Sequence, residues 1–352
     1  MAFAIVTASI LVSSCDKDMK LQNGNAGTTD IVLDIPMLKA ETRNPIQGTA
    51  EEDAIYTLRV IILSLNAESI NKVLKSTPDN PIPNSILIEN VPVGKVQMYV
   101  IANEAALGKN YDDLSVLQSE VDQSLKKVLI KDESRTFFPK RGSEFANENS
   151  TPEATKGLPM TWLNKTLTIT PPQYERGNIK PQEIEVALQR CVSKLNITMT
   201  NVSTEEDIVI KDMNFGAFFG DRLYLFQEGN LDVPKDANYV KYDYADLKEP
   251  EDTTKDGITI PKNNGQKNLV LYIYPSFAWK NGNEASPYTI GFKTMSGLTY
   301  APQYFMNDYA LNSIARNTQV NIEARLSKSK VVDLIFSVEP WTEITVEVPS
   351  FD

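Results

Sequence analysis

Aliphatic side chains recur at every second position in many short segments of this 352-residue chain. Successive residues of a strand point to opposite faces of a sheet, so an alternating segment has one apolar and one polar face. Proline and glycine residues interrupt the alternation at short intervals, where turns are expected. The pattern predicts an all-β fold of packed antiparallel β-sandwiches.

The first alternating segment, residues 30–37, predicts a strand with one weak edge. Four side chains share its apolar face: Ile31, Leu33, Ile35 and Met37. Pro36 suits an edge position because it cannot donate a backbone hydrogen bond. A polar loop, residues 40–53, separates this strand from the next one, residues 54–63, which is apolar on both faces toward its end.

The same signals predict further strands in both halves of the chain. These strands are residues 85–91, 95–102, 125–130, 161–169, 207–215, 222–226, 268–274, 288–293, 317–326, 331–338 and 343–348. The charged stretch 245–257 is expected to be a solvated loop.

The apolar positions change parity within residues 183–199, being even up to Leu188 and odd from Cys191 onward. A shift of one residue exchanges the two faces of a strand, so the chain must bulge or change sheets near Gln189–Arg190. We therefore expect two domains in tandem, residues 30–188 and 189–352. The length agrees, since one core rarely grows beyond about 250 to 300 residues.

A short apolar run, residues 3–12, precedes Cys15, after which the chain turns polar. The run is too short to span a bilayer as a helix, and small residues stand just before the cysteine. This is typical of a bacterial lipoprotein signal, and it predicts a signal segment 1–15, lipidation of Cys15 with chains such as palmitate, and a tether over residues 16–29. The alternative is a signal peptide cleaved nearby, with an incidental cysteine.

The composition indicates an exported protein without catalysis. Asp and Glu number 46 against 35 Lys and Arg, and the net charge of -11 disfavours nucleic acid as a partner. The chain has no histidine, which removes His-based acid–base catalysis, Ser-His-Asp triads and the commonest zinc ligand. We expect no catalytic residues, no cofactor and no metal. Cys191 is expected to be a small buried apolar residue.

Aromatic residues close to residue 275 allow two interpretations. The residues are Tyr272, Tyr274, Phe277 and Trp279. Together they could form a sugar-binding platform, but their alternation with aliphatic residues favours ordinary sheet packing.

Seven short segments follow one another over nearly the whole chain: 55–62 (IYTLRVII), 91–95 (VPVGK) leading to 100–104 (VIANE), 157–161 (GLPMT), 188–195 (LQRCVSKL), 271–275 (LYIYP), 314–318 (IARNT) and 338–342 (VEPWT). In this order, behind a lipoprotein signal, they resemble the Bacteroides-type fimbrillin family, the subunits of the type V pilus.

The resemblance implies a fold and a mode of assembly. Fimbrillins are exported as lipoproteins to the outer membrane and have two transthyretin-like β-sandwich domains. A trypsin-like Arg-specific protease removes the first strand, and the open groove accepts a strand from a neighbouring subunit. The expected partners are therefore that protease and other fimbrillin subunits in an extracellular pilus, whose receptor the sequence does not identify.

The candidate processing site is Arg43, followed by Asn44, in the polar loop after the first strand. Pro45 is one residue too far along to block cleavage after Arg43. Cleavage there would remove the strand over residues 30–38. An ordinary loop arginine is the alternative. Arg59 is a poorer candidate because it lies within a predicted strand, and Lys140–Arg141 would place the cut inside the first domain.

The candidate donor strand is residues 342–351, in which Ile344, Val346 and Val348 alternate with polar residues. Residues 331–338 are a second candidate, although we expect them to be a resident strand. A loop arginine and an alternating C-terminus favour a stalk subunit that supports adhesion and biofilm formation. The alternatives are a tip or accessory subunit, a surface glycan-binding lipoprotein with exposed Trp162 and Trp279, and a carboxylate glycosidase.

Overall fold

The structure of the protein is a computed structural model that describes residues 27–36, 52–65, 67–77, 80–107, 110–115, 117, 127–128, 140–141, 157–175, 177–226, 233, 237–249, 252, 254–279, 284–305, 310–328 and 332–340. The structure is all-β, as the alternation predicts. Within these ranges, no helix is both long and apolar enough to cross a membrane.

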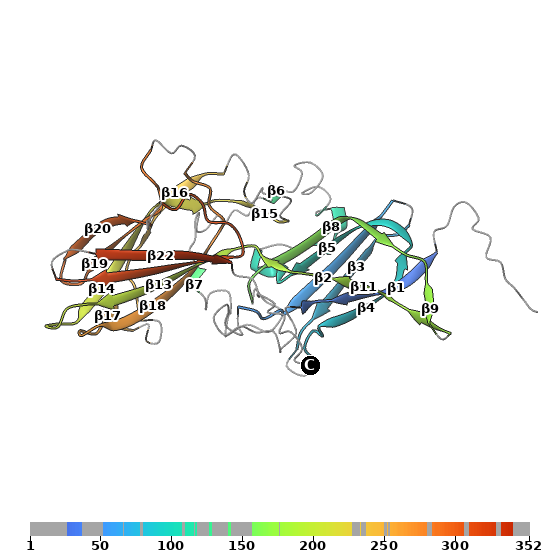
Figure 1. Cartoon of the computed structure of the whole chain (residues 1–352), viewed down its shortest axis with the longest axis horizontal. Coiled ribbons are helices and arrows are strands. Elements are labelled where there is room, and N and C mark those ends of the chain that lie inside the picture. Colours follow the sequence, from blue (N-terminus) through green and yellow to red (C-terminus); the bar gives the residue numbers. More distant parts are fainter. Residues whose placement is uncertain are drawn as a thin grey trace, which may run out of the picture.

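The first half of the chain forms two sheets with the orders β11-β1-β4 and β12-β8-β5-β2-β3 (Figure 1). Strands β9 and β10 make a separate ribbon. The bounds are β1 (Thr28–Asp34), β2 (Thr57–Ser64), β3 (Ile70–Lys75), β4 (Ser85–Pro92), β5 (Gly94–Ala102), β8 (Met160–Ile169), β9 (Gln173–Glu175), β10 (Asn178–Lys180), β11 (Gln182–Glu185) and β12 (Gln189–Arg190), with a 3₁₀ turn at Glu104–Leu107.

The second half also forms two sheets, with the orders β22-β21-β13-β18-β7 and β16-β14-β19-β20, in which β17 also pairs with β14; apart from β7 (Lys140–Arg141), their strands are drawn in yellow-green to red in Figure 1. Their bounds are β13 (Ser193–Asn201), β14 (Ile208–Gly220), β16 (Tyr239–Tyr244), β17 (Ile258–Ile260), β18 (Gly265–Ile273), β19 (Thr289–Thr294), β20 (Thr299–Tyr304), β21 (Thr318–Leu326) and β22 (Val332–Pro340).

The first strand of each half is an internal strand with one parallel and one antiparallel neighbour. Strand β1 pairs with β11 in parallel and with β4 in antiparallel orientation. Strand β13 likewise pairs with β21 in parallel and with β18 in antiparallel orientation. Strand β1 therefore completes a sheet whose other two strands come later in the chain.

Two hydrophobic cores lie between these sheets. One contains the apolar faces of β1, β2, β4, β5 and β11. The other contains the aromatic cluster of Phe215, Phe218 and Phe219, in which the rings of Phe218 and Phe219 stack at 4.6 Å. The same alternation that predicts the strands therefore supplies both cores.

The predicted change of parity is confirmed. Strand β11 belongs to the small sheet of the first half, β12 pairs with β8 in the larger sheet, and β13 is the central strand of a sheet in the second half. Cys191 and Val192 contribute to the first core, and Leu195 contributes to the second. The chain changes faces here because it changes sheets.

Three expectations about the middle of the chain are corrected. Strand β6 (Lys127–Val128) pairs with β15 (Leu223–Tyr224) in a separate two-stranded sheet, and β7 (Lys140–Arg141) pairs with β18, so both segments pair with strands that come later than the expected first domain. The stretch 245–257 is not simply solvated, because Leu247 is fully buried and Glu249 is 5% exposed. Strands β3, β16, β17 and β20 are absent from the sequence-based prediction.

Tyr288 is a buried ionisable group in the second core. Its hydroxyl donates to the carbonyl oxygen of Ser276 at 3.0 Å and accepts from the backbone N–H of Ala278 at 3.1 Å. Burial raises the pKa of Tyr288 to about 12. The folded chain thus retains a proton that an unfolded tyrosine loses near pH 10.

We predict that the free energy of unfolding falls between pH 10 and about 12, losing up to about 2.7 kcal/mol through this residue, because the unfolded chain ionises first. Below pH 10 the contribution is complete. Urea unfolding of the natural chain and of Tyr288→Phe over this range checks the slope. The variant should show the shallower dependence, and parallel curves would contradict the assignment.

Candidate functional site

Strand β1 occupies a seat formed by the facing edges of β4 and β11 and by the core beneath them. Residues 31–34 pair with 182–185 of β11, and residues 28–34 pair with 85–92 of β4, with a bulge between Thr29 and Ile31. Beyond the strand, the N–H of Ile35 donates to the carbonyl of Asn84 and the N–H of Val186 donates to that of Asp34, each at 2.8 Å. Both edges of β1 are thus hydrogen-bonded.

The apolar face of β1 is completely buried. Ile31, Leu33 and Ile35 each have 0% of their surface exposed. Leu33 lies between Ile86 of β4 and Ile184 of β11, which belong to the same core. At about 1.5 to 3 kcal/mol for each side chain, the three residues contribute roughly 5 to 9 kcal/mol of burial.

The end of β1 near its bulge is fixed by a polar contact. Asn90 has a positive φ of 59°, and its backbone N–H donates to the Asp30 carboxylate at 3.0 Å. Asparagine tolerates this left-handed conformation better than most residues. The contact sets the register of β1 against β4, so that its aliphatic residues face the core.

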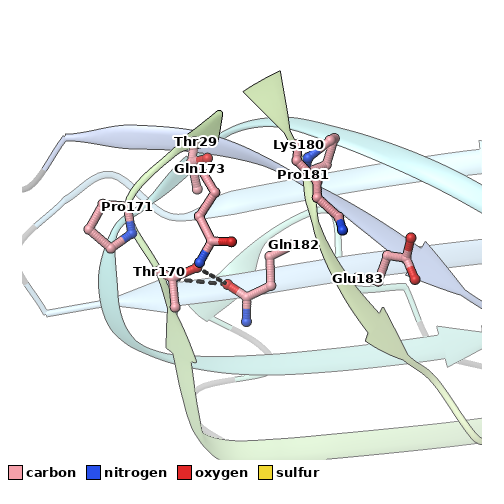
Figure 2. Close-up of a pocket in the computed structure, with 8 residues that line it drawn as sticks. All are labelled: Thr29, Thr170, Pro171, Gln173, Lys180, Pro181, Gln182 and Glu183. Atoms are coloured by element: carbon pink, nitrogen blue, oxygen red, sulfur yellow. Dashed lines mark hydrogen bonds between the residues drawn. The ribbon is translucent and has the colours of Figure 1, made fainter. Parts of the chain in front are cut away.

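A pocket of about 250 Å³ adjoins this end of the seat (Figure 2). Thr29 closes it on the side of β1, and residues 170–173 and 180–183 supply the other walls. Gln182 Oε1 accepts from the Thr170 N–H at 2.9 Å and from its hydroxyl at 3.1 Å. The lining is polar and hydrogen-bonded, without an arrangement of an acid, a base and a nucleophile.

A buried charge cluster holds the chain just before β2. Glu52 accepts a hydrogen bond of 2.5 Å from the Tyr272 hydroxyl and forms a 2.8 Å ion pair with Lys194. Asp53 pairs with Arg190, whose side chain is 4% exposed. Burial lowers the pKa of the Arg190 guanidinium from its ordinary value, an effect that the charges of Asp53 and Glu52 oppose.

The cluster joins the two halves of the chain, because its acids precede β2 while Lys194 and Tyr272 belong to β13 and β18. The sequence analysis treated residues 40–53 as a polar loop and missed this role. The sequence feature that could have predicted the cluster is a lysine and an arginine among the apolar residues of segment 188–199. Buried cations need acidic partners.

The structure describes only some of the other predicted site residues. The residues outside the described ranges are Cys15, Met37, Arg43, Asn44, Ile344, Val346 and Val348. Arg59 is 3% exposed and pairs with Glu104 at 2.6 Å, consistent with its rejection as a processing site. In the part of the chain that the structure describes, no three potential metal ligands gather.

The buried cysteine and the aromatic residues pack as ordinary core. Cys191 is 0% exposed, and burial raises the pKa of its thiol. Tyr272 and Tyr274 are 3% and 7% exposed, so the packing interpretation of these two side chains is confirmed. Trp162 packs against the first core and Trp279 against the second, so the two rings do not form one platform.

Neither a protein-family profile nor a curated protein sequence matches the chain. Solved structures do match. The tip fimbrial protein Mfa3 from Porphyromonas gingivalis, with a C-terminal truncation, has a TM-score of 0.52 at 14% identity, over 89% of this chain and 100% of that one. A Bacteroides eggerthii protein, provisionally described as a cell adhesion protein, has a TM-score of 0.50 at 13% identity, over 91% and 98%.

The chain has the fold of a fimbrial protein. At these identities the likeness establishes the fold alone, and it confirms the predicted resemblance to fimbrillins and the all-β class at that level. The fimbrillin fold places β1 at an internal position of its sheet, which makes its seat the candidate functional site.

We predict that Leu33→Ala lowers the free energy of unfolding by about 3 kcal/mol, because it leaves a cavity under β1. Val32→Ala is the matched control, since the neighbouring side chain points outward and should change stability by less than about 1 kcal/mol. Urea unfolding of both variants provides the comparison. Equal losses would mean that β1 does not face the core as described.

We predict that Glu52→Gln costs about 3 to 5 kcal/mol, because it removes the carboxylate that neutralises the buried ammonium of Lys194. Glu284→Gln, at an exposed position, should stay within about 0.5 kcal/mol of the natural chain. Thermal and urea unfolding measure both. A loss as small as that of the control would show that the cluster is not essential to stability.

Proposed function

We propose that the protein is a structural, non-enzymatic subunit of a type V pilus that assembles by donor-strand exchange. The observation that carries this proposal is the position of β1: it is the first strand in the part of the chain that the structure describes, it fills the centre of a sheet, and Arg43 follows it in the sequence. An internal strand at the start of a chain can be removed without cutting the remaining core.

In this proposal the chain is exported as a lipoprotein through Cys15 and reaches the outer membrane. A trypsin-like protease then cuts between Arg43 and Asn44, which releases the lipid, the tether 16–29 and the strand 30–38 together. The N-terminal domain, residues 30–188, is left open, while the C-terminal domain, residues 189–352, is complete. The mature subunit is then held in the pilus by its neighbours.

The energetics favour refilling the seat after cleavage. Loss of β1 leaves the backbone groups of β4 and β11 unpaired and exposes the core surface beneath, which is unfavourable in water. A strand with the same alternation restores the hydrogen bonds on both sides and roughly the same burial.

The buried charge cluster supports the proposal that cleavage releases β1 alone. Glu52 and Asp53 follow the proposed cleavage site by only nine and ten residues, and both are bound to residues of the later part of the chain. Cleavage therefore frees β1 while β2 stays fixed. The seat can empty without unfolding the first core.

The proposed donor is the C-terminal segment 342–351, with Ile344, Val346 and Val348 on its apolar face. Insertion of one subunit's C-terminus into the next subunit's seat is a head-to-tail contact that does not close, so it produces a filament. We favour a stalk position, in which the polymer supports adhesion and biofilm formation. A tip or accessory position is the second candidate, because a tip fimbrial protein is among the solved structures that share the fold.

We predict that an Arg-specific protease cuts the full chain after Arg43 and that the cleaved chain then forms ladders resistant to heat and detergent. N-terminal sequencing should begin at Asn44. Arg59 should remain uncut because its side chain is buried and ion-paired.

The matched control is Arg43→Ala, which should retain its N-terminus and remain monomeric under the same treatment. Ladders formed by this variant would place the processing site elsewhere. Cleavage after Arg43 that yields only monomers would contradict the stalk assignment, and no cleavage in the loop would contradict the processing step itself.

A further inference from the structure

The outward face of the β1 sheet is acidic. Five carboxylate residues from its three strands lie on this face: Asp30 and Asp34 of β1, Glu89 of β4, and Glu183 and Glu185 of β11. The three glutamates are exposed, and Val32 and Leu87 are the aliphatic residues between them. The strand in the seat therefore has apolar side chains beneath its inward face and negatively charged side chains beside its outward face.

The register brings these charges next to the outward positions of β1. Asp34 pairs with Glu185 of β11 and with Ser85 of β4, while Val32 pairs with Glu183. Like charges on directly adjacent cross-strand positions are destabilising, and opposite charges are stabilising. An occupant with lysine or arginine at these positions would place a positive charge beside Glu183 and Glu185.

The cations close to the sheet have their own contacts. Lys72 Nζ donates to the carbonyl oxygen of Leu87 at 3.2 Å, and Lys180 pairs with Glu175 at 3.6 Å. Neither contact is with Glu183 or Glu185. A basic occupant would therefore supply opposite charge at the centre of the outward face.

The C-terminal segments of this chain carry acidic residues at the corresponding positions. When Ile344, Val346 and Val348 face inward, Glu343 and Glu347 face outward. In the sequence of β22, Asp333 and Glu339 occupy positions that alternate with Leu334. Either segment would bring two further carboxylates to an acidic surface.

We propose that the seat of β1 ranks incoming strands by charge: the acidic C-terminus of a second copy enters it, as in the filament proposed above, and a strand from a different subunit with neutral or basic outward side chains binds more tightly. This inference rests on the proposed strand exchange and specifies the partner. The apolar floor supplies affinity for any alternating strand, and the glutamates of β11 discriminate between strands.

The test measures binding of two peptides to the full chain after Arg-specific cleavage. One peptide has the sequence of residues 341–352, and the other is the same peptide with Glu343→Lys and Glu347→Lys. Fluorescence polarisation at about 50 mM salt should show about tenfold tighter binding of the lysine peptide. At about 0.5 M salt the difference in affinity between the two peptides should nearly vanish, because salt screens the electrostatic interactions and leaves the hydrophobic contribution to binding.

The matched acceptor variant is Glu183→Lys with Glu185→Lys, which should reverse the preference toward the acidic peptide. Glu284→Lys has the same charge change at a distant exposed position and should leave the preference unchanged. The single variant Glu185→Gln, which retains a polar side chain of similar size, should reduce the preference severalfold. It keeps the test informative if the double variant does not fold.

The outcomes separate the two proposals. Equal affinity of the peptides at low salt, or tighter binding of the acidic one, overturns charge selection and leaves strand exchange intact. Failure of both peptides to bind the cleaved chain overturns both proposals, because the seat then accepts no strand. A preference that persists at high salt or in the Glu183/Glu185 lysine variant would assign selectivity to packing and also overturn the inference.

Discussion

The structure of the first half depends on the burial of one face of β1. Ile31, Leu33 and Ile35 fill the core between two sheets, and the backbone of the strand joins β4 to β11. Without this strand, two edges and an apolar surface would face water. The apolar part of this requirement is met by any strand that places alternating aliphatic side chains at this position.

The buried charge cluster solves a different problem. Glu52 and Asp53 are held by Lys194, Tyr272 and Arg190, at a desolvation cost that only close partners offset. Apolar burial and backbone pairing hold β1, whereas ionic contacts hold the chain just before β2.

Much of the fold followed from local pattern. Segments such as 85–91 and 161–169 were predicted to within one residue, because their alternation reports burial directly. Edge strands such as β3, β16 and β20 were missed because their burial pattern is weak. The pairing of β6 with β15 and of β7 with β18 had no local signal, since pairing over such distances depends on how the cores pack.

The alternation of residues 30–37 and the parity change near Gln189 determined, from sequence alone, that a strand precedes Arg43 and that the chain passes between sheets near its middle. A periodicity specifies which face of a strand is buried but leaves its neighbours undefined. Only the tertiary structure decided that β1 is internal, that β11 is its parallel partner, and that Glu183 and Glu185 lie beside its outward face. These pairings join residues about 150 positions apart, because cross-strand neighbours are set by the packing of the whole sandwich.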